Sequence, residues 1–314
     1  MIRMILRRIV LALLMLIALN AITYVAALFI RTMWPVQFRP SEADSLRPTA
    51  QSLAQSYVSY LGSFAHGDFG SLTDTGRPII QMIATALPKS LVLIGLALLV
   101  SAVVGVGLGL FSLNSHTRQV NPLALMTSLA GFSMPGFYLS IVVIYLIITS
   151  AQPGKALLPA SGYGLDSHLV LPILALAIRP TAEVARLTAE FMAEELPKDY
   201  IRAARAKGLP WRLVLLRHAF RNILSLVLTS LSNSLRYTIS SLIVIEWLFQ
   251  WPGIGRLLAS NFVRGPNRFI FEVEPALSAG IITVIAILFM LTTFVVDAAT
   301  FSLDPRVRRQ AAGL

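Results

Sequence analysis

The 314-residue sequence has no cysteine and few charged residues. Without cysteine, disulfide frameworks, thiolate metal sites and cysteine nucleophiles are excluded. Asp, Glu, Lys and Arg make up 13% of the chain, about half the ~25% of ordinary soluble domains. With 56% apolar residues and a mean hydropathy of +0.73, the chain has more apolar surface than a soluble fold of this size can bury. This composition argues against a cytosolic globule, a nucleic-acid-binding domain and a disordered chain.

The sequence patterns of common catalytic sites are also missing. A P-loop needs Gly-Lys followed by Ser or Thr, and the nearest string, Gly154-Lys155, is followed by Ala156. The four histidines form no His-Glu-x-x-His pair, and no Gly-x-Ser-x-Gly elbow occurs. His66 and Asp68 supply only two metal ligands in a loop, which favours a structural turn. We therefore expect no catalytic residue, no metal site and no cofactor bound by this chain itself.

The sequence contains long apolar runs with few charged residues. A membrane-spanning helix needs about 20 mostly apolar residues, and six segments of the sequence are candidates. They are 9–30, 91–113, 123–150, a segment from 169 that is uncharged to 178 and continues as a helix past Arg179, 223–249, and 276–301. The first run exceeds the 7–15 residues of a signal-peptide core, which favours a membrane anchor over a cleaved signal. The sequence predicts an all-α integral membrane protein with six transmembrane helices.

The net charge of +11 predicts an orientation rather than a nucleic-acid partner. With the N-terminus inside, the inner segments hold 16 of the 26 Lys and Arg residues, and the longer outer segments hold 9. Basic residues concentrate on the cytoplasmic side of a membrane, so we expect both termini in the cytoplasm of a cell-membrane protein. The predicted parts are the N-terminal end with the first helix at 1–30, an extracytoplasmic lobe at 31–90, and a five-helix core at 91–314 with a cytoplasmic loop at 179–222.

The second half of this loop reads LPKDYIRAARAKGLPWRLVLLRHAFRN. Alanines favour a helix over 197–207, and Gly208 allows the left-handed residue that ends it. A second amphipathic helix is predicted from Trp211. Ala203, Ala204 and Gly208 are small enough for another protein surface to approach the backbone closely. The basic residues would equally suit an interfacial helix on lipid headgroups, so the residues alone leave both alternatives open.

Two features lie inside the predicted spans. Arg236 falls near the middle of its span, where a lipid-facing guanidinium is costly. We expect it to face the bundle interior, a partner subunit or an aqueous translocation pathway. There it would either make a structural pair or attract the carboxylate of a peptide-like solute. Gly105 and Gly109 have the spacing at which two membrane helices pack closely.

Several strings carry a family resemblance. Ala203-Ala204-x-x-x-Gly208 resembles the EAA loop of ABC importer permeases, with Arg202 where the family often has Glu. The wider string YIRAARAKGLP…LLRHAFRN is similar to the dipeptide/oligopeptide/nickel permease family, in its B-type subunit. HGDFG, ALPKSL, LPASGYG, EWLFQWPGIGR and LDPRVR agree in order and spacing, so that the resemblance covers roughly 66–309. Arg236 departs from the family, which tends to have small residues there.

The resemblance implies the type I ABC importer permease fold and a division of labour between subunits. The EAA helix would be a coupling helix seated in a groove of a cytoplasmic ATPase subunit. Two such ATPases would bind ATP and Mg, and a homologous second permease and an extracytoplasmic solute-binding protein would complete the complex in the lipid bilayer. This chain would form half of the pathway for peptides or a related small solute. The contact residues implied are Tyr200, Ala203, Ala204, Gly208 and Leu209.

A self-sufficient secondary carrier or channel is the alternative function. An ion-coupled carrier usually holds ionisable groups deep in its bundle. The acids of the predicted spans, Glu246 and Asp297, lie near helix ends instead, which disfavours a carrier. An intramembrane enzyme is a third alternative, because Ser and His residues distant in sequence could converge in space.

Overall fold

The computed structural model describes residues 2–38, 50–72, 75–112, 136–150, 158–262 and 273–303. These residues are helical or irregular, and the β-structure among them is one bridge between Ser71 and Pro78. The chain forms two compact units, with crossings after Leu91, Gln250 and Met290. The first unit consists of Met1–Leu91 and Trp251–Met290, and the second unit consists of Val92–Gln250 and Leu291–Leu314.

Five helices are long and apolar enough to cross a membrane. They are Val10–Arg31, Ile79–Phe111, Ser167–Glu195, Trp211–Leu248 and Pro275–Val295. They correspond to the first, second, fourth, fifth and sixth predicted spans. α6 (Gly136–Ser150) is part of the predicted third span, and residues 123–135 of that span lie outside the described residues. The all-α membrane fold is therefore confirmed, while the count of six remains a prediction.

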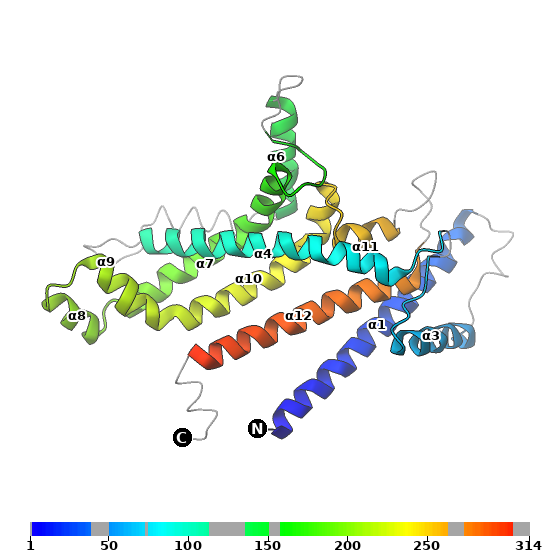
Figure 1. The fold of residues 1–314 in the computed structure, drawn as a ribbon, viewed down its shortest axis with the longest axis horizontal. Helices are drawn as coiled ribbons and strands as arrows, with labels where there is room; N and C mark the ends of the chain where they lie inside the picture. The colour runs from blue at the N-terminus through cyan, green and yellow to red at the C-terminus, as the bar shows by residue number, and fades with distance from the viewer. Residues whose placement is uncertain are drawn as a thin grey trace. The chain divides into compact units, whose positions relative to one another are not determined.

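The first unit is held together by a buried asparagine. Asn20 donates from Nδ2 to Thr283 Oγ1 at 2.9 Å and to the Tyr60 hydroxyl at 3.3 Å. Its Oδ1 accepts from the Tyr57 hydroxyl at 3.3 Å. Because a buried amide needs partners, Asn20 fixes three helices against one another. The helices of this unit in Figure 1 are α1 (Ile2–Phe38), α3 (Ala50–Ala65), the start of α4 (Ile79–Phe111), α11 (Ile254–Phe262) and the start of α12 (Pro275–Leu303).

The helices extend into the segment 31–90. α1 continues past Ile30, and α4 begins at Ile79 instead of near Leu91. The apolar run from Ile79 lengthens the helix, which contains Pro88 in its interior. The carbonyl of Lys89 accepts a hydrogen bond from the Trp251 indole at 3.1 Å. The early turns of α4 are therefore part of the packed first unit.

The second unit is built around α7 (Val170–Glu195) and α10 (Phe220–Leu248), which pack along each other. α4 approaches α7 through its glycines. A Cβ at Gly105 would lie 2.9 Å from the Thr181 carbonyl oxygen, and one at Gly109 would lie 2.7 Å from the Ala185 carbonyl oxygen. The structure confirms the close helix packing that the glycine spacing predicted.

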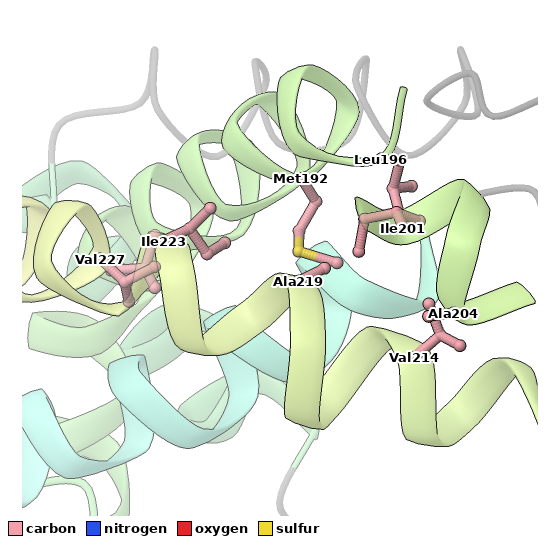
Figure 2. Close-up of a cluster of buried hydrophobic side chains, with 9 residues drawn as sticks. Met192, Leu196, Ile201, Ala204, Val214, Ala219, Ile223 and Val227 are labelled. Carbon is pink, nitrogen blue, oxygen red and sulfur yellow. The ribbon is translucent and has the colours of Figure 1, made fainter. Parts of the chain in front are cut away.

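Three short elements connect α7 with α10: α8 (Asp199–Ala206), α9 (Trp211–Leu213) and the π-helical turn η3 (Val214–Ala219). In Figure 1 they lie beyond the ends of α7 and α10. The predicted second amphipathic helix and the fifth span are one continuous helix from Trp211 to Leu248. A buried cluster joins all these elements (Figure 2), and its labelled members are Met192, Leu196, Ile201, Ala204, Val214, Ala219, Ile223 and Val227.

Candidate functional site

α8 is the helix on which the predicted coupling residues lie. It begins at Asp199 instead of Pro197, because Lys198 is extended at φ −66° and ψ 149°. It ends where the sequence predicts: Gly208 has φ +77°, and its N–H donates to the Arg205 carbonyl at 2.9 Å. A left-handed glycine after the last turn is a common helix ending. The local sequence therefore predicts the C-terminal end of α8, whereas the predicted start at Pro197 is too early.

The structure divides the five predicted contact residues into two groups. Ala204 is 6% exposed and lies beside Val214 (Figure 2), and Leu209 is half-buried against the same cluster. These two residues anchor α8 to its own chain. Tyr200, Ala203 and Gly208 are exposed, and a Cβ at Gly208 would meet nothing within 4 Å. The surface open to a partner is therefore formed by these three residues and their exposed neighbours.

The exposed side of α8 is basic and contains small residues. Arg202, Arg205 and Lys207 are exposed there. Arg202 pairs with Asp199, and the Arg205 guanidinium lies 5.2 Å from the centre of the Trp211 ring. A helix that lies on a membrane must turn an apolar face towards the lipid. The apolar side of α8 is buried in the cluster of its own chain, and this favours a protein partner over lipid headgroups.

A network of polar side chains attaches α8 to both long helices. Glu195, at the end of α7, is only 7% exposed. Its Oε1 accepts from the Tyr200 hydroxyl at 2.5 Å and from Asn222 Nδ2 at 3.3 Å, and its Oε2 pairs with Lys198. Asn222, near the start of α10, also donates to the Tyr200 oxygen at 2.8 Å. Burial, and the hydrogen bond to Glu195, raise the pKa of Tyr200 to about 12, so the phenol stays neutral and keeps donating at physiological pH.

Sequence reasoning missed this network. Glu195 and Asn222 are 27 residues apart, and neither belongs to a recognisable motif. The available signal was indirect: an acidic residue directly precedes a break at Leu196-Pro197, so its side chain can meet the element that follows. Among the described residues, no group of three or more His, Cys, Asp and Glu side chains could hold a metal ion.

Arg236 lies on an exposed face of α10 and donates to the Asn233 side-chain oxygen. Next to it, Tyr237 carries a second arginine: the Arg179 guanidinium lies 4.0 Å from the centre of the Tyr237 ring. α7 continues through Arg179 without a break, as the sequence predicted for the fourth span. A non-local contact therefore brings Arg179 to the level of Arg236.

Comparison with known families decides the class of the protein. The model of the family described as "Binding-protein-dependent transport system inner membrane component" matches residues 103–309. The chain belongs to this family. It is accordingly a multi-pass inner-membrane permease subunit of an ABC importer, as the EAA-like string and its companion strings predicted. The EAA-like region and both long helices of the second unit lie inside the matched residues.

Individual relatives within this permease family match over most of their length. The dipeptide transport system permease protein DppB of Lactococcus lactis subsp. cremoris is 34% identical over 257 residues, with 82% of this chain and 81% of that protein covered. The probable D,D-dipeptide transport system permease protein DdpB of Escherichia coli K12 is 30% identical over 284 residues, with the same coverages. The di/tripeptide permease protein DppB of Pseudomonas aeruginosa is 31% identical over 282 residues, with 82% of each chain covered.

A solved structure shares the fold. A chain from an inward-facing structure of the MetNI methionine ABC transporter aligns with a TM-score of 0.57. The alignment covers 72% of this chain and 97% of that chain at 14% identity. At this identity the likeness concerns the fold alone. It agrees with the predicted ABC importer permease fold.

Proposed function

We propose that this permease forms one half of a translocation pathway for peptides or a related small solute, and that α8 docks it to a cytoplasmic ATPase subunit. The observation that carries the docking proposal is the arrangement of α8. Its apolar side is buried in its own chain, while Tyr200, Ala203 and Gly208 stay exposed among basic residues. The peptide assignment is supported by the names of the relatives, which describe dipeptide and di/tripeptide systems.

The proposal includes the other subunits and the orientation. A homologous second permease would form the other half of the pathway, two ATPases would bind ATP and Mg, and an extracytoplasmic protein would deliver the solute. Both termini would lie in the cytoplasm, where α8 can reach an ATPase. This chain would bind no cofactor and catalyse no reaction itself. The binding-protein-dependent character of the family supports this set of partners.

The mechanism follows from how α8 is attached. When ATP binding draws the two ATPases together, each docked coupling helix moves with its ATPase. In this chain the Glu195 network and the buried cluster tie α8 to α7 and α10. A displacement of α8 would therefore be passed to both long helices instead of being absorbed by a flexible loop. Close-packed interiors transmit such displacements because they deform little.

Substitutions at Gly208 test whether α8 docks closely. Asn tolerates the left-handed conformation better than other residues with a Cβ, so Gly208→Asn keeps the helix ending and adds bulk to the exposed surface. We expect Gly208→Asn and Gly208→Leu to lower solute uptake per ATP hydrolysed about tenfold or more in the reconstituted importer, because the new side chain blocks seating. The matched control is Gly67→Asn, since Gly67 has φ +81° and similarly open surroundings in the first unit.

Three outcomes would overturn parts of this proposal. Normal coupling in Gly208→Asn together with loss in Gly208→Leu would mean that only the backbone conformation matters, and not close docking. Co-purification of the tagged chain without P-loop ATPases would contradict the partner set. Ion-driven uptake by this chain alone in liposomes would replace the importer with a self-sufficient carrier.

A further inference from the structure

The exposed face of α10 is polar in its middle. Thr229, Asn233, Arg236 and Ser240 recur at intervals of three and four residues, which places them on one side of the helix. All four are exposed. They lie inside Trp211–Leu248, which is one of the helices long and apolar enough to cross a membrane. The row also falls within the narrower span predicted at residues 223–249, so we expect it at membrane depth.

α7 carries a second polar row with the same spacing, formed by Arg179, Glu183, Arg186 and Glu190. Two contacts join it to α10: Arg179 lies over the Tyr237 ring, and Ser234 Oγ donates to Glu183 Oε2 at 3.3 Å. The side of α7 that meets the glycines of α4 is a different one, formed around Val184 and Thr188. The two rows thus form one continuous surface, which we call the polar surface of α7 and α10.

Other helices of the same unit show what a lipid-exposed face looks like. The exposed residues of α4 in this unit are apolar, and include Leu99, Val103 and Leu108. Those of α6 include Phe137 and Ile141. Ionised side chains facing acyl chains are costly, and in membrane proteins they face a water-filled cavity or other protein. The polar surface of α7 and α10 is therefore turned towards water or towards protein.

We propose that Arg179, which lies over the Tyr237 ring, and Arg236, the residue before Tyr237 on α10, form an anion-binding position for a carboxylate of the transported solute. The inference rests on the proposed function and adds a second arginine and a location to it. Among the eight residues of the two rows, three are arginines and two are glutamates. Glu190 pairs with Arg186, and Glu183 accepts a hydrogen bond from the buried Ser234, which leaves the charge of Glu183 in place. Arg236 donates to the neutral side-chain amide of Asn233.

A solute pathway is a better match for this arrangement than an interface with the second permease. Helix interfaces in membranes are rich in small residues that allow close approach, whereas this surface presents long charged side chains. A guanidinium buried at an interface needs a matched acid, because an unpaired buried charge is strongly unfavourable. In a hydrated pathway the guanidinium stays solvated and binds a passing carboxylate weakly enough to release it, as transport requires.

The absence of cysteine makes a direct test possible. Ser240→Cys places one thiol a helical turn from Arg236 in the full importer complex in nanodiscs. We measure the rates at which this thiol reacts with an anionic and with a cationic methanethiosulfonate. Each rate is divided by the rate of the same reagent with a small free thiol, and the two ratios are compared. We expect the anionic reagent to be favoured about tenfold, because basic clefts concentrate anions. The preference should disappear when Arg179→Gln and Arg236→Gln are added. Val103→Cys, at a position 66% exposed on α4, should react slowly with both reagents because lipid covers it.

Transport of a probe dipeptide, alanyl-alanine, links the surface to the solute. We expect Arg179→Gln and Arg236→Gln each to lower uptake per ATP hydrolysed about tenfold, the loss of one charge-assisted hydrogen bond. The complex should still assemble, and the lysine variants should retain most of the uptake. Arg31→Gln, at the end of the α1 span and half-exposed beside Glu274, is the control and should transport normally.

The outcomes separate this inference from the proposed function. An unreactive Ser240→Cys thiol, or loss of the second permease in Arg236→Gln, would mean that protein covers the surface, and would overturn the inference. Unchanged uptake in the double glutamine variant would overturn it as well. All three results leave ATP-driven uptake by the unaltered complex intact. If the proposed function is wrong, the unaltered complex itself shows no ATP-driven uptake.

Discussion

α4 and α10 both pack against α7, but by different means. α4 approaches through Gly105 and Gly109, which bring the two backbones close. α10 approaches through side chains, with Ser234 bonded to Glu183 and Tyr237 beneath Arg179. The exposed faces of the two helices also differ. The exposed side of α4 is apolar, and the exposed side of α10 is polar. Two helices with similar membrane-spanning lengths thus present different exposed surfaces, an apolar one on α4 and a polar one on α10.

The largest effect is expected where α4 meets α7. In Gly109→Ala the new Cβ would lie 2.7 Å from the Ala185 carbonyl oxygen, so the backbones must separate. We expect the free energy of unfolding to fall by about 3 kcal/mol, as in overpacked cores. Gly107→Ala, where a Cβ meets nothing within 4 Å, should be neutral or slightly stabilising because alanine favours helix. Denaturation of the purified chain by sodium dodecyl sulfate compares them, and equal stabilities would refute the close packing.

The next effect is expected at the junction of α7, α8 and α10. Glu195→Ala removes the acceptor shared by Tyr200 and Asn222, and should cost about 2 kcal/mol, because buried groups lose their hydrogen bonds. Glu190→Ala on the same helix is the control: its side chain is 52% exposed and pairs only with Arg186 among the described salt bridges. Exposed pairs contribute about 0.5 kcal/mol. Thermal unfolding that ranks the two variants equally would contradict the network.

A smaller effect, with a pH signature, is expected for Tyr200→Phe. Loss of one hydrogen bond should cost about 1 kcal/mol at neutral pH. The pKa of Tyr200 is raised from 10.0 to about 12 in the folded chain. Its stabilising contribution is therefore complete below pH 10 and is lost as the pH rises towards 12. Stability measured across this interval should fall more steeply in the unaltered chain than in Tyr200→Phe, and parallel curves would show that the phenol is not held by Glu195.

The smallest effect on stability is expected on the exposed face of α10. Thr229→Ala and Arg236→Gln should change the free energy of unfolding by less than about 0.5 kcal/mol, as is usual for exposed positions. Arg236→Gln should nevertheless lower dipeptide uptake. A large loss of stability in either variant, in the same detergent titration, would mean that this face is packed, and the contrast with α4 would then fail.

The sequence predicted the features that depend on neighbouring residues. Apolar runs located the spans, Gly208 marked the end of α8, and the spacing of Gly105 and Gly109 predicted close packing. The start of α4 at Ile79 was not predicted, because Pro88 and Lys89 interrupt the apolar pattern of the sequence. In the structure, a hydrogen bond from the Trp251 indole to the Lys89 carbonyl supports these turns.

Contacts between distant residues were not predictable from a single sequence. Arg179 interrupts an apolar run and was therefore predicted at a membrane boundary. Its partner Tyr237 lies on another helix, so the contact between the two side chains does not show in the local sequence. Glu195 and Asn222 likewise meet only because α7 and α10 pack together. Side-chain periodicity indicates which face of a helix is polar, but not which neighbouring helix completes it.

The π-helical turn at Val214–Ala219 lies between α8 and the polar face of α10. A π turn holds one residue more than an α turn, and each residue rotates a helix by about 100°. Because a π turn takes up its extra residue by rotating less per residue, deleting one residue there would restore α-helical geometry and leave Arg236 and its row at nearly the same angle relative to Trp211. A one-residue deletion between Phe220 and Thr229 would instead rotate the row by about 100°. The chain is thus expected to tolerate a change of length at the π-helical turn far better than in the regular helix that follows it.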